Sequence, residues 1–297
     1  RVESTTMEIP NVSEWYSKTD PIIIGGELTL FFAFMTWLIS SITGNFSQVD
    51  RIWSITPIIY GIHWAVHPVI AHGEVISQRL LIMAILVALW GLRLTYNFYR
   101  KGGYSYGGED YRWEELRRII NNRFLFHLFN ISFISFYQCT LLYLISLPGY
   151  IALINRSTPL NIVDWIAIST FLFFLVVETI ADQQQWNFQT KKYELINQKK
   201  PLTGEFTQGF ISSGLFKYSR HPNFFCELMI WWCYYLFSVS SSCVNDSLNS
   251  CGWLNWSIIG TILLTLLFQG SSVFTESLSA KKYPLYKKYT QATSKLV

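Results

Sequence analysis

The chain has 297 residues, of which 51% are hydrophobic and 14% are charged, and its formal net charge is +4. A soluble domain of this length needs far more charge to cover its surface, so these values exclude an ordinary soluble globular protein. The apolar residues gather in runs of about 20, long enough as helices to cross a hydrocarbon core roughly 30 Å thick. The composition therefore predicts an all-α, polytopic membrane protein.

Residues 1–21 form a polar N-terminal segment ahead of the first apolar run. They include Glu3, Glu8, Glu14 and Asp20, and they contain no apolar stretch of the kind found in a signal peptide. We therefore expect the first spanning segment itself to direct insertion into the membrane.

Seven apolar runs follow and predict about seven transmembrane helices in a single membrane domain, 22–297. The second run carries two prolines. The fourth continues past Leu147-Pro148-Gly149 to Ile154, which indicates a re-entrant piece, an interfacial piece or a break in a longer helix. The runs are 22–43, 52–72, 80–99, 124–147, 161–181, 222–243 and 253–275.

Lysine and arginine concentrate in three segments, 100–123, 182–221 and 281–295. Seven spans place these segments on one side of the membrane, and cytosolic loops carry the excess of basic residues. We therefore predict a lumenal N-terminus and a cytosolic C-terminus. Cys243 and Cys251 then share an outer loop, where they could form a disulfide.

Three polar features lie near the cytosolic ends of the predicted spans. Arg93 lies near the end of span three, where it could snorkel to the interface or reach a phosphate. The segment 102–113 is glycine-rich, fits neither a P-loop nor a Rossmann turn, and is interpreted as a lid or a surface turn. Glu178, Asp182 and Gln185 share one face of span five, which suits a wet cavity or a solvated helix end.

The sharpest motif runs from Gly214 to Glu227. Pro222 suits the first turn of span six, so Arg220 and His221 lie beside free backbone N–H groups that favour an anion such as a phosphate. Asn223 and Glu227 are four residues apart on one helix face, and a carboxylate at that depth is a candidate functional group. The alternative is a basic flank, a capped helix and a carboxylate neutralised by a neighbouring helix.

His63 and His67 are also four apart on one face of span two, with His72 following. A membrane di-iron centre needs about eight histidines and the chain has five, so we expect no metal site. Core hydrogen bonding or proton donation near a substrate is the preferred interpretation.

These motifs together resemble the steroid 5-alpha-reductase superfamily, and most closely its DUF1295 branch. The resemblance rests on Gly214 to Glu227, Asp182-Gln-Gln-Gln-Trp186 and Lys282-Tyr-Pro-Leu-Tyr-Lys-Lys-Tyr289. The segments Asp50-Arg-Ile-Trp53, Trp90-Gly-Leu-Arg93 and Glu109-Asp-Tyr-Arg112 extend it over about residues 50 to 290. The resemblance implies a seven-helix bundle in the endoplasmic reticulum membrane, with substrate-side helices 1–4 (22–155) and cofactor-side helices 5–7 (156–297).

The resemblance also implies NADPH, bound from the cytosolic side, and reduction of a C=C bond conjugated to a carbonyl in a lipid or sterol. The substrate would enter from the bilayer between spans one to four. We expect membrane lipids around the bundle and no nucleic-acid partner. The expected cofactor-binding residues are Arg93, Asp182, Gln185, Tyr218, Arg220, His221, Asn223, Glu227, Lys282 and Tyr286.

The catalytic pair of the steroid reductases has no evident counterpart here, and Asp50, Tyr60 and His63 are candidates by depth and chemistry. Two other functions stay open. Isoprenylcysteine and phospholipid methyltransferases resemble the same C-terminal pattern, and Glu276 could be their downstream glutamate for binding S-adenosylmethionine. A reductase-like bundle could also persist as a non-catalytic lipid-binding or assembly subunit.

Overall fold

The computed structural model describes residues 12–243 and 250–296, and within these ranges the regular secondary structure is helical apart from an isolated bridge between Ser219 and Ser294. Residues 1–11 of the predicted polar segment lie outside the described residues. The long helices are α2 (Pro21–Thr43), α4 (Thr56–His72), α5 (Gln78–Arg100), α10 (Ile162–Asn197), α12 (Pro222–Ser241) and α13 (Ile258–Lys282).

The remaining elements are shorter. The fourth apolar run is divided into α7 (Arg123–Phe129), the π-helix η1 (Asn130–Tyr137), α8 (Gln138–Ser146) and α9 (Pro148–Ile154). The connecting segments form α1 (Val12–Lys18), α3 (Gln48–Ile52), α6 (Tyr111–Ile120), α11 (Glu205–Gln208), the 3₁₀ turn η2 (Gly214–Lys217) and α14 (Tyr286–Ala292).

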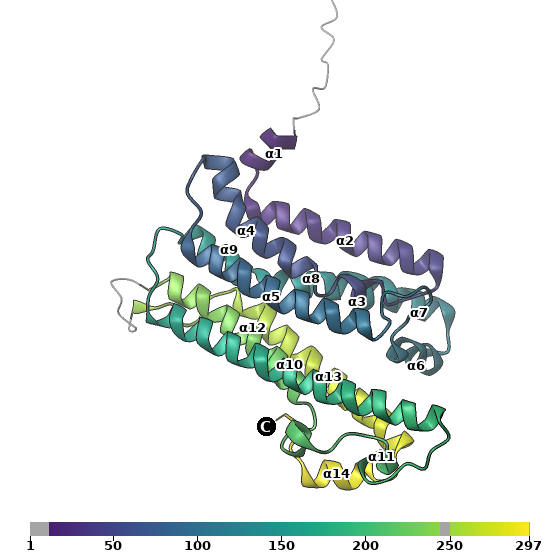
Figure 1. Cartoon of the computed structure of the whole chain (residues 1–297). Coiled ribbons are helices and arrows are strands. Elements are labelled where there is room, and N and C mark those ends of the chain that lie inside the picture. Colours follow the sequence, from purple (N-terminus) through teal and green to yellow (C-terminus); the bar gives the residue numbers. More distant parts are fainter. Residues whose placement is uncertain (1–11, 244–249, 297) are drawn as a thin grey trace, which may run out of the picture.

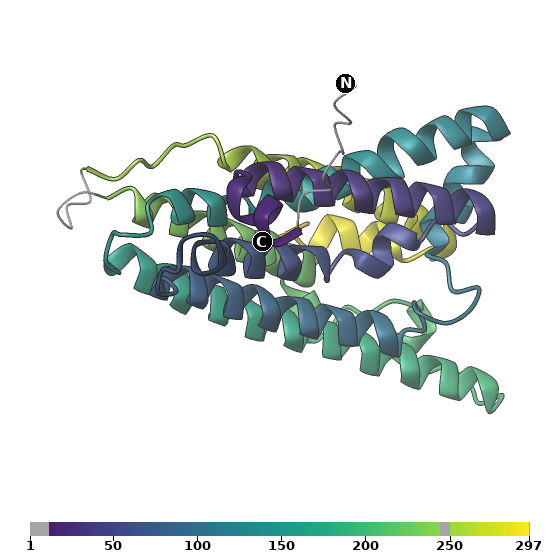
Figure 2. The same ribbon diagram turned by 90° about the horizontal axis from the view of Figure 1, so that it is seen from above.

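The long helices lie lengthwise beside one another in a single bundle (Figures 1 and 2). Short helices α3, α6 and α7 gather near the end where α5 finishes, and α11 and α14 lie below the ends of α10 and α13 in Figure 1. Large aromatic side chains fill the middle: Trp64, Trp90 and Trp231 are each at most 1% exposed. At Gly260 a Cβ would lie 2.3 Å from the backbone of Leu144, so glycine allows α13 to pack directly against α8.

Five helical segments are long and apolar enough to cross a membrane: Pro21–Thr43, Gln78–Arg100, Arg123–Ile154, Ile162–Asn197 and Ile258–Lys282. The predicted all-helical membrane fold is confirmed, whereas the number seven is not. The predicted spans 52–72 and 222–243 correspond to α4 and α12, which are not among the five. Turns at 53–55 start α4 later than expected, and its 17 residues rise only about 25 Å.

Helix α10 continues well beyond the predicted end of span five at residue 181. Its 36 residues rise about 54 Å at ~1.5 Å per residue, more than the thickness of a hydrocarbon core. The polar residues 182–197 contain no glycine or proline, so the helix has no reason to stop where its hydrophobicity does.

Helices α5 and α10 run parallel, since ion pairs connect their residues in the same order along the two helices. Arg79 pairs with Asp164 near the start of both helices, and Arg93 pairs with Glu178 and Asp182 near the end of α5. These two arginines therefore mark opposite ends of the same helix interface.

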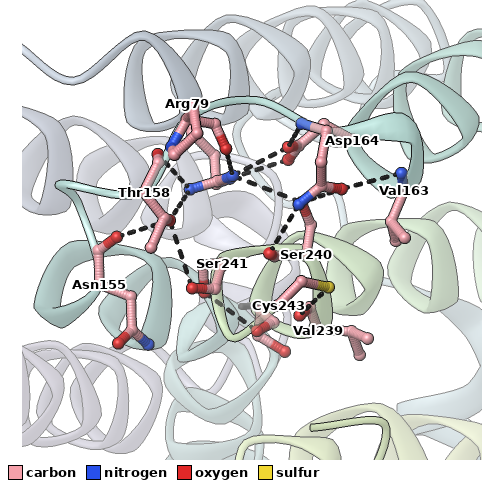
Figure 3. Close-up of polar contacts among 12 residues, drawn as sticks. Arg79, Asn155, Thr158, Val163, Asp164, Val239, Ser240, Ser241 and Cys243 are labelled. Carbon is pink, nitrogen blue, oxygen red and sulfur yellow. Dashed lines mark hydrogen bonds and ion pairs between the residues drawn. The ribbon is translucent and has the colours of Figure 1, made fainter. Parts of the chain in front are cut away.

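The Arg79 end is a closed polar network (Figure 3). Arg79 Nε and Nη2 donate to the Asp164 carboxylate at 2.8 and 2.9 Å, Nη1 donates to Thr158, and Nη2 also reaches Pro159 O and Ser240 Oγ. The Arg79 and Asp164 side chains are 1% and 0% exposed. Cys243 and Cys251, whose pairing the sequence left open, form a disulfide, and Cys243 lies beside this network in Figure 3.

Candidate functional site

A cavity of about 790 Å³ lies between α3, α5, α6, η1, α10, α12 and α13. Its volume falls in the range of small-molecule sites. One side of its wall is polar and the other is aromatic and aliphatic. The polar lining residues are Asp50, Ser54, Asn97, Lys101, Asp110, Arg112, Gln138, Glu178, Asp182, Asn223, Glu227 and Ser271.

The polar wall is built around Arg93. Its Nη1 donates to Asp182 Oδ2 at 2.6 Å, and its Nη2 forms ion pairs with Glu178 Oε1 at 2.8 Å and Glu227 Oε2 at 3.7 Å. Amide groups of Asn97 and Asn223 also donate to Asp182. Side chains from α5, α10 and α12 therefore meet at one point.

Two indole groups fix the position of Glu227. Trp90 Nε1 donates to Oε2 at 2.8 Å and Trp231 Nε1 donates to Oε1 at 3.0 Å. Both rings are buried, and they pack edge to face. The carboxylate is therefore held rigidly at the cavity wall.

The Arg93 cluster leaves buried acceptors and buried donors without hydrogen-bond partners. Arg93 is one cation among three carboxylates, so negative charge is in excess there. Within the described residues, two buried acceptors, Glu178 Oε2 and Gln185 Oε1, and two buried donors, Arg93 Nε and Nη2, have no hydrogen-bond partner. Unpaired buried polar atoms are rare in native proteins and call for a ligand, water or strain to explain them. The cluster therefore favours a ligand that donates hydrogen bonds or carries positive charge.

Basic side chains line a different part of the cavity. Arg112 pairs with Asp110 at 2.8 Å and also donates to Ser271 on α13, while Lys101 is exposed at the end of α5. Asp50 lies nearby and accepts a hydrogen bond from Trp113 Nε1 at 2.8 Å. Burial raises the pKa of Asp50, and the positive charge of Arg112 opposes that rise.

The apolar wall contains a ladder of stacked rings on the π-helix. Phe129 stacks on Phe133 with ring centroids 5.0 Å apart, and Phe133 stacks on Tyr137 at 5.2 Å. All three line the cavity. π-Helical turns are rare and often occur at functional sites, and here the turn presents three flat faces to the cavity.

Of the three predicted catalytic residues, only Asp50 lines the cavity. Tyr60 is fully buried and bonded to Thr29 Oγ1 at 2.8 Å. His63 is bonded to Tyr16 Oη and to Pro21 O, both at 2.9 Å. The histidine thus holds α1 and the start of α2 against α4. In residues 12–243 and 250–296, no group of three His, Cys, Asp or Glu side chains is placed to hold a metal ion.

Four of the predicted cofactor-binding residues, Arg93, Asp182, Asn223 and Glu227, are brought together by the fold. Gln185 lies one turn beyond Asp182 on α10, with its buried Oε1 unpaired. Asn97 was missed by sequence reasoning, although its place one turn after Arg93 on the same face could have suggested it.

Arg220 and His221 form a separate cluster with Glu276. Arg220 Nε and His221 Nε2 each lie 2.8 Å from Glu276 Oε1, and Arg220 Nη1 donates to the carbonyl oxygens of Thr290 and Thr293. Burial lowers the pKa of His221, and Glu276 opposes that shift. Arg220 therefore clamps the C-terminal tail, and its guanidinium is engaged within the chain.

The other three predicted residues lie outside the cavity lining. Tyr218 is 73% exposed. Lys282 is exposed, with its ammonium 5.4 Å from the centre of the Tyr283 ring. Tyr286 is buried against Phe210, with ring centroids 5.0 Å apart.

Comparison with known proteins gives a family but no described activity. The model of a family described as a protein of unknown function, DUF1295, matches residues 36–293. An uncharacterized protein of the fission yeast Schizosaccharomyces pombe is 39% identical over 286 residues, which cover 94% of this chain and 80% of that protein. No solved structure gives a significant match.

Proposed function

The chain belongs to the DUF1295 family, and from that premise we propose that it is an NADPH-dependent reductase of a C=C bond conjugated to a carbonyl in a lipid or sterol. The observation that carries the proposal is the two-sided cavity, in which a buried acid and amide cluster faces a wall of stacked rings. The one side suits a polar cofactor and the other an apolar substrate.

The residues present fit the chemical groups of NADPH. Asp182, Glu227 and the amide of Asn223 line the cavity and could take the N–H and O–H donors of a carboxamide and a ribose. Glu178 also lines the cavity, and its buried Oε2 has no hydrogen-bond partner within the described chain. Lys101 and Arg112 supply positive charge for phosphate groups where the lining turns basic. Arg220, assigned to a phosphate by sequence, is not needed for this arrangement.

Bound NADPH would supply a hydride to the β-carbon of the substrate. The chain itself must then provide a proton at the α-carbon or polarise the carbonyl. Asp50 is the candidate: it lines the cavity, Trp113 fixes one carboxyl oxygen, and burial raises the pKa of its carboxyl. A raised pKa keeps the proton on Asp50 at a pH where an exposed aspartate has lost it.

The apolar helices favour an integral membrane protein. We place it in the endoplasmic reticulum, with the part of the cavity that contains Lys101 facing the cytosol. NADPH would then reach the site from the cytosolic side.

One observation favours a membrane methyltransferase as the second candidate. Three carboxylates around Arg93 leave negative charge in excess, and the sulfonium of S-adenosylmethionine is a cation. Against this, Glu276, the glutamate that the methyltransferase pattern would use, is bonded to Arg220 and His221.

Titration of NADPH and of S-adenosylmethionine against the purified protein in lipid nanodiscs tests the proposal. We expect saturable NADPH binding and no binding of S-adenosylmethionine, followed by turnover in a screen of lipid enones. Binding of S-adenosylmethionine alone would transfer the assignment to methyl transfer. Binding of neither would leave a non-catalytic lipid-binding or assembly subunit.

A further inference from the structure

The lining of the cavity includes exposed residues at two different places on the bundle. Of the residues that line it, three are exposed: Lys101, Leu266 and Gly270. Lys101 follows the end of α5 among the polar loops. Leu266 and Gly270 lie one turn apart near the middle of α13, a helix long and apolar enough to span a membrane.

The second of these places therefore faces lipid. Leu266 is 61% exposed, as expected for a side chain on the outer face of a membrane helix. Gly270 leaves a gap, because a Cβ added there would meet no atom within 4 Å.

The cavity walls next to Leu266 and Gly270 suit an apolar chain. Leu267, Phe268 and Phe274 of α13 line the cavity together with Phe133 and Tyr137 of the π-helix ladder. Arg112 donates to Ser271 at 3.2 Å, which places a charged group next to Gly270 and marks the boundary between the apolar and the polar part.

We propose that the gap at Leu266 and Gly270 is a lateral portal through which the apolar chain of a bilayer lipid enters and lies against the Phe129–Phe133–Tyr137 ladder. The proposal deepens the proposed function, on which it rests for the identity of this lipid as the reductase substrate. It differs from the entry between spans one to four that the resemblance implied, because no residue of α2 lines the cavity.

Photocrosslinking tests the portal with a defined probe. The protein is placed in phosphatidylcholine nanodiscs containing a trace of palmitic acid with a mid-chain diazirine and a terminal alkyne, irradiated without any dinucleotide, and digested for mass spectrometry. We expect label on Phe133, Tyr137 and Phe268 themselves, assigned residue by residue from the fragment spectra.

Substitution of Gly270 then closes the portal without removing any contact. Label on Phe133, Tyr137 and Phe268 should fall about tenfold in Gly270→Trp, equivalent to ~1.4 kcal/mol. Gly270→Leu gives a smaller fall in the same direction and serves if the tryptophan variant does not fold. Gly26→Trp is the matched control, since a Cβ at Gly26 of α2 also meets nothing within 4 Å and Gly26 is outside the cavity lining.

Label confined to the outer faces of the helices, or cavity label undiminished in Gly270→Trp and Gly270→Leu, would overturn the portal. The two proposals fail separately. A protein that takes label at these three cavity residues but binds no NADPH keeps the portal and loses the reductase assignment.

Discussion

Two buried arginines on the same helix, Arg79 and Arg93, have opposite surroundings. Arg79 faces one carboxylate, each of its guanidinium nitrogens donates a hydrogen bond, and it is not among the residues that line the 790 Å³ cavity. Arg93 faces three carboxylates beside a cavity, and Arg93 Nε and Glu178 Oε2 have no partner within the described chain.

The difference separates structure from function. A buried polar network that is balanced and fully bonded rigidifies the fold, and it loses stability when one member is removed. A network with unpaired buried groups beside a cavity calls for a ligand, a water molecule or strain to explain them. Burial of a charge alone therefore does not identify a site, whereas unsatisfied groups beside a cavity do.

The largest expected effect is on stability at the Arg79 end. Arg79→Leu leaves Asp164 buried without its cation and should lower the free energy of unfolding by about 3–5 kcal/mol. Thermal unfolding in detergent measures it. Arg156→Leu is the control, because its ion pair with Glu74 is 32% and 38% exposed and exposed ion pairs contribute little to stability. Equal losses in both variants would contradict a special role for Arg79.

Asp50→Asn should act on turnover and not on stability. Loss of a general acid should lower kcat about 100-fold or more, with NADPH affinity unchanged. Because burial raises the pKa of Asp50, wild-type turnover should be full below that pKa and fall as the pH rises through it. Rates measured with a lipid enone across pH check this. Tyr60→Phe, outside the cavity lining, is the control, and a wild-type rate that increases with pH would exclude Asp50 as the acid.

Asn223→Ala tests the Arg93 end of the interface with an uncharged side chain. Removing its amide from the cavity wall should weaken NADPH binding about two- to tenfold, the worth of one hydrogen bond, with little change in the unfolding temperature. Asn155→Ala at the Arg79 end should leave affinity unchanged. Titration of NADPH against both variants measures this difference. Equal NADPH affinities of the two variants would place the cofactor elsewhere.

The smallest effect on NADPH affinity is expected at Lys101, where the lining of the cavity is exposed among the polar loops. Lys101 is exposed, so Lys101→Ala should reduce NADPH affinity only about two- to fivefold, and the difference should disappear at high salt. Lys191→Ala, exposed and paired with Glu194, is the control. An effect that persists in 1 M salt would mean that Lys101 contacts the ligand in a desolvated position.

Hydrophobic runs predicted where the bundle would be but not where its helices end. The polar end of α10 stays helical because nothing in residues 182–197 breaks a helix, and α4 is shortened by turns that composition does not reveal. The π-helical turn at Asn130–Tyr137 also has no evident sequence signal. The sequence marked Leu147-Pro148-Gly149 as a place where the fourth run could change, and Pro148 starts a new helix, α9, there.

Local spacing predicted half of the site. Their spacing indicated that Glu178 and Asp182 share one face of α10 and that Asn223 and Glu227 share one face of α12. In the structure these two faces meet around Arg93. Long-range pairing could not be read in the same way. Nothing near Arg220 in the sequence shows that Glu276 and the tail carbonyls occupy its guanidinium, and nothing near Arg79 points to Asp164.

The most direct test of the account uses the matched aspartates of α10. Asp164→Asn and Asp182→Asn each neutralise one carboxylate facing an arginine of α5, and both are measured for NADPH affinity and unfolding temperature in the same lipid. The account predicts that Asp182→Asn loses about 10- to 100-fold in affinity, the worth of hydrogen bonds to a charged group, while Asp164→Asn loses stability and keeps its affinity. If Asp182→Asn binds NADPH as tightly as wild type, or if wild type binds none, the Arg93 cluster is not the cofactor site.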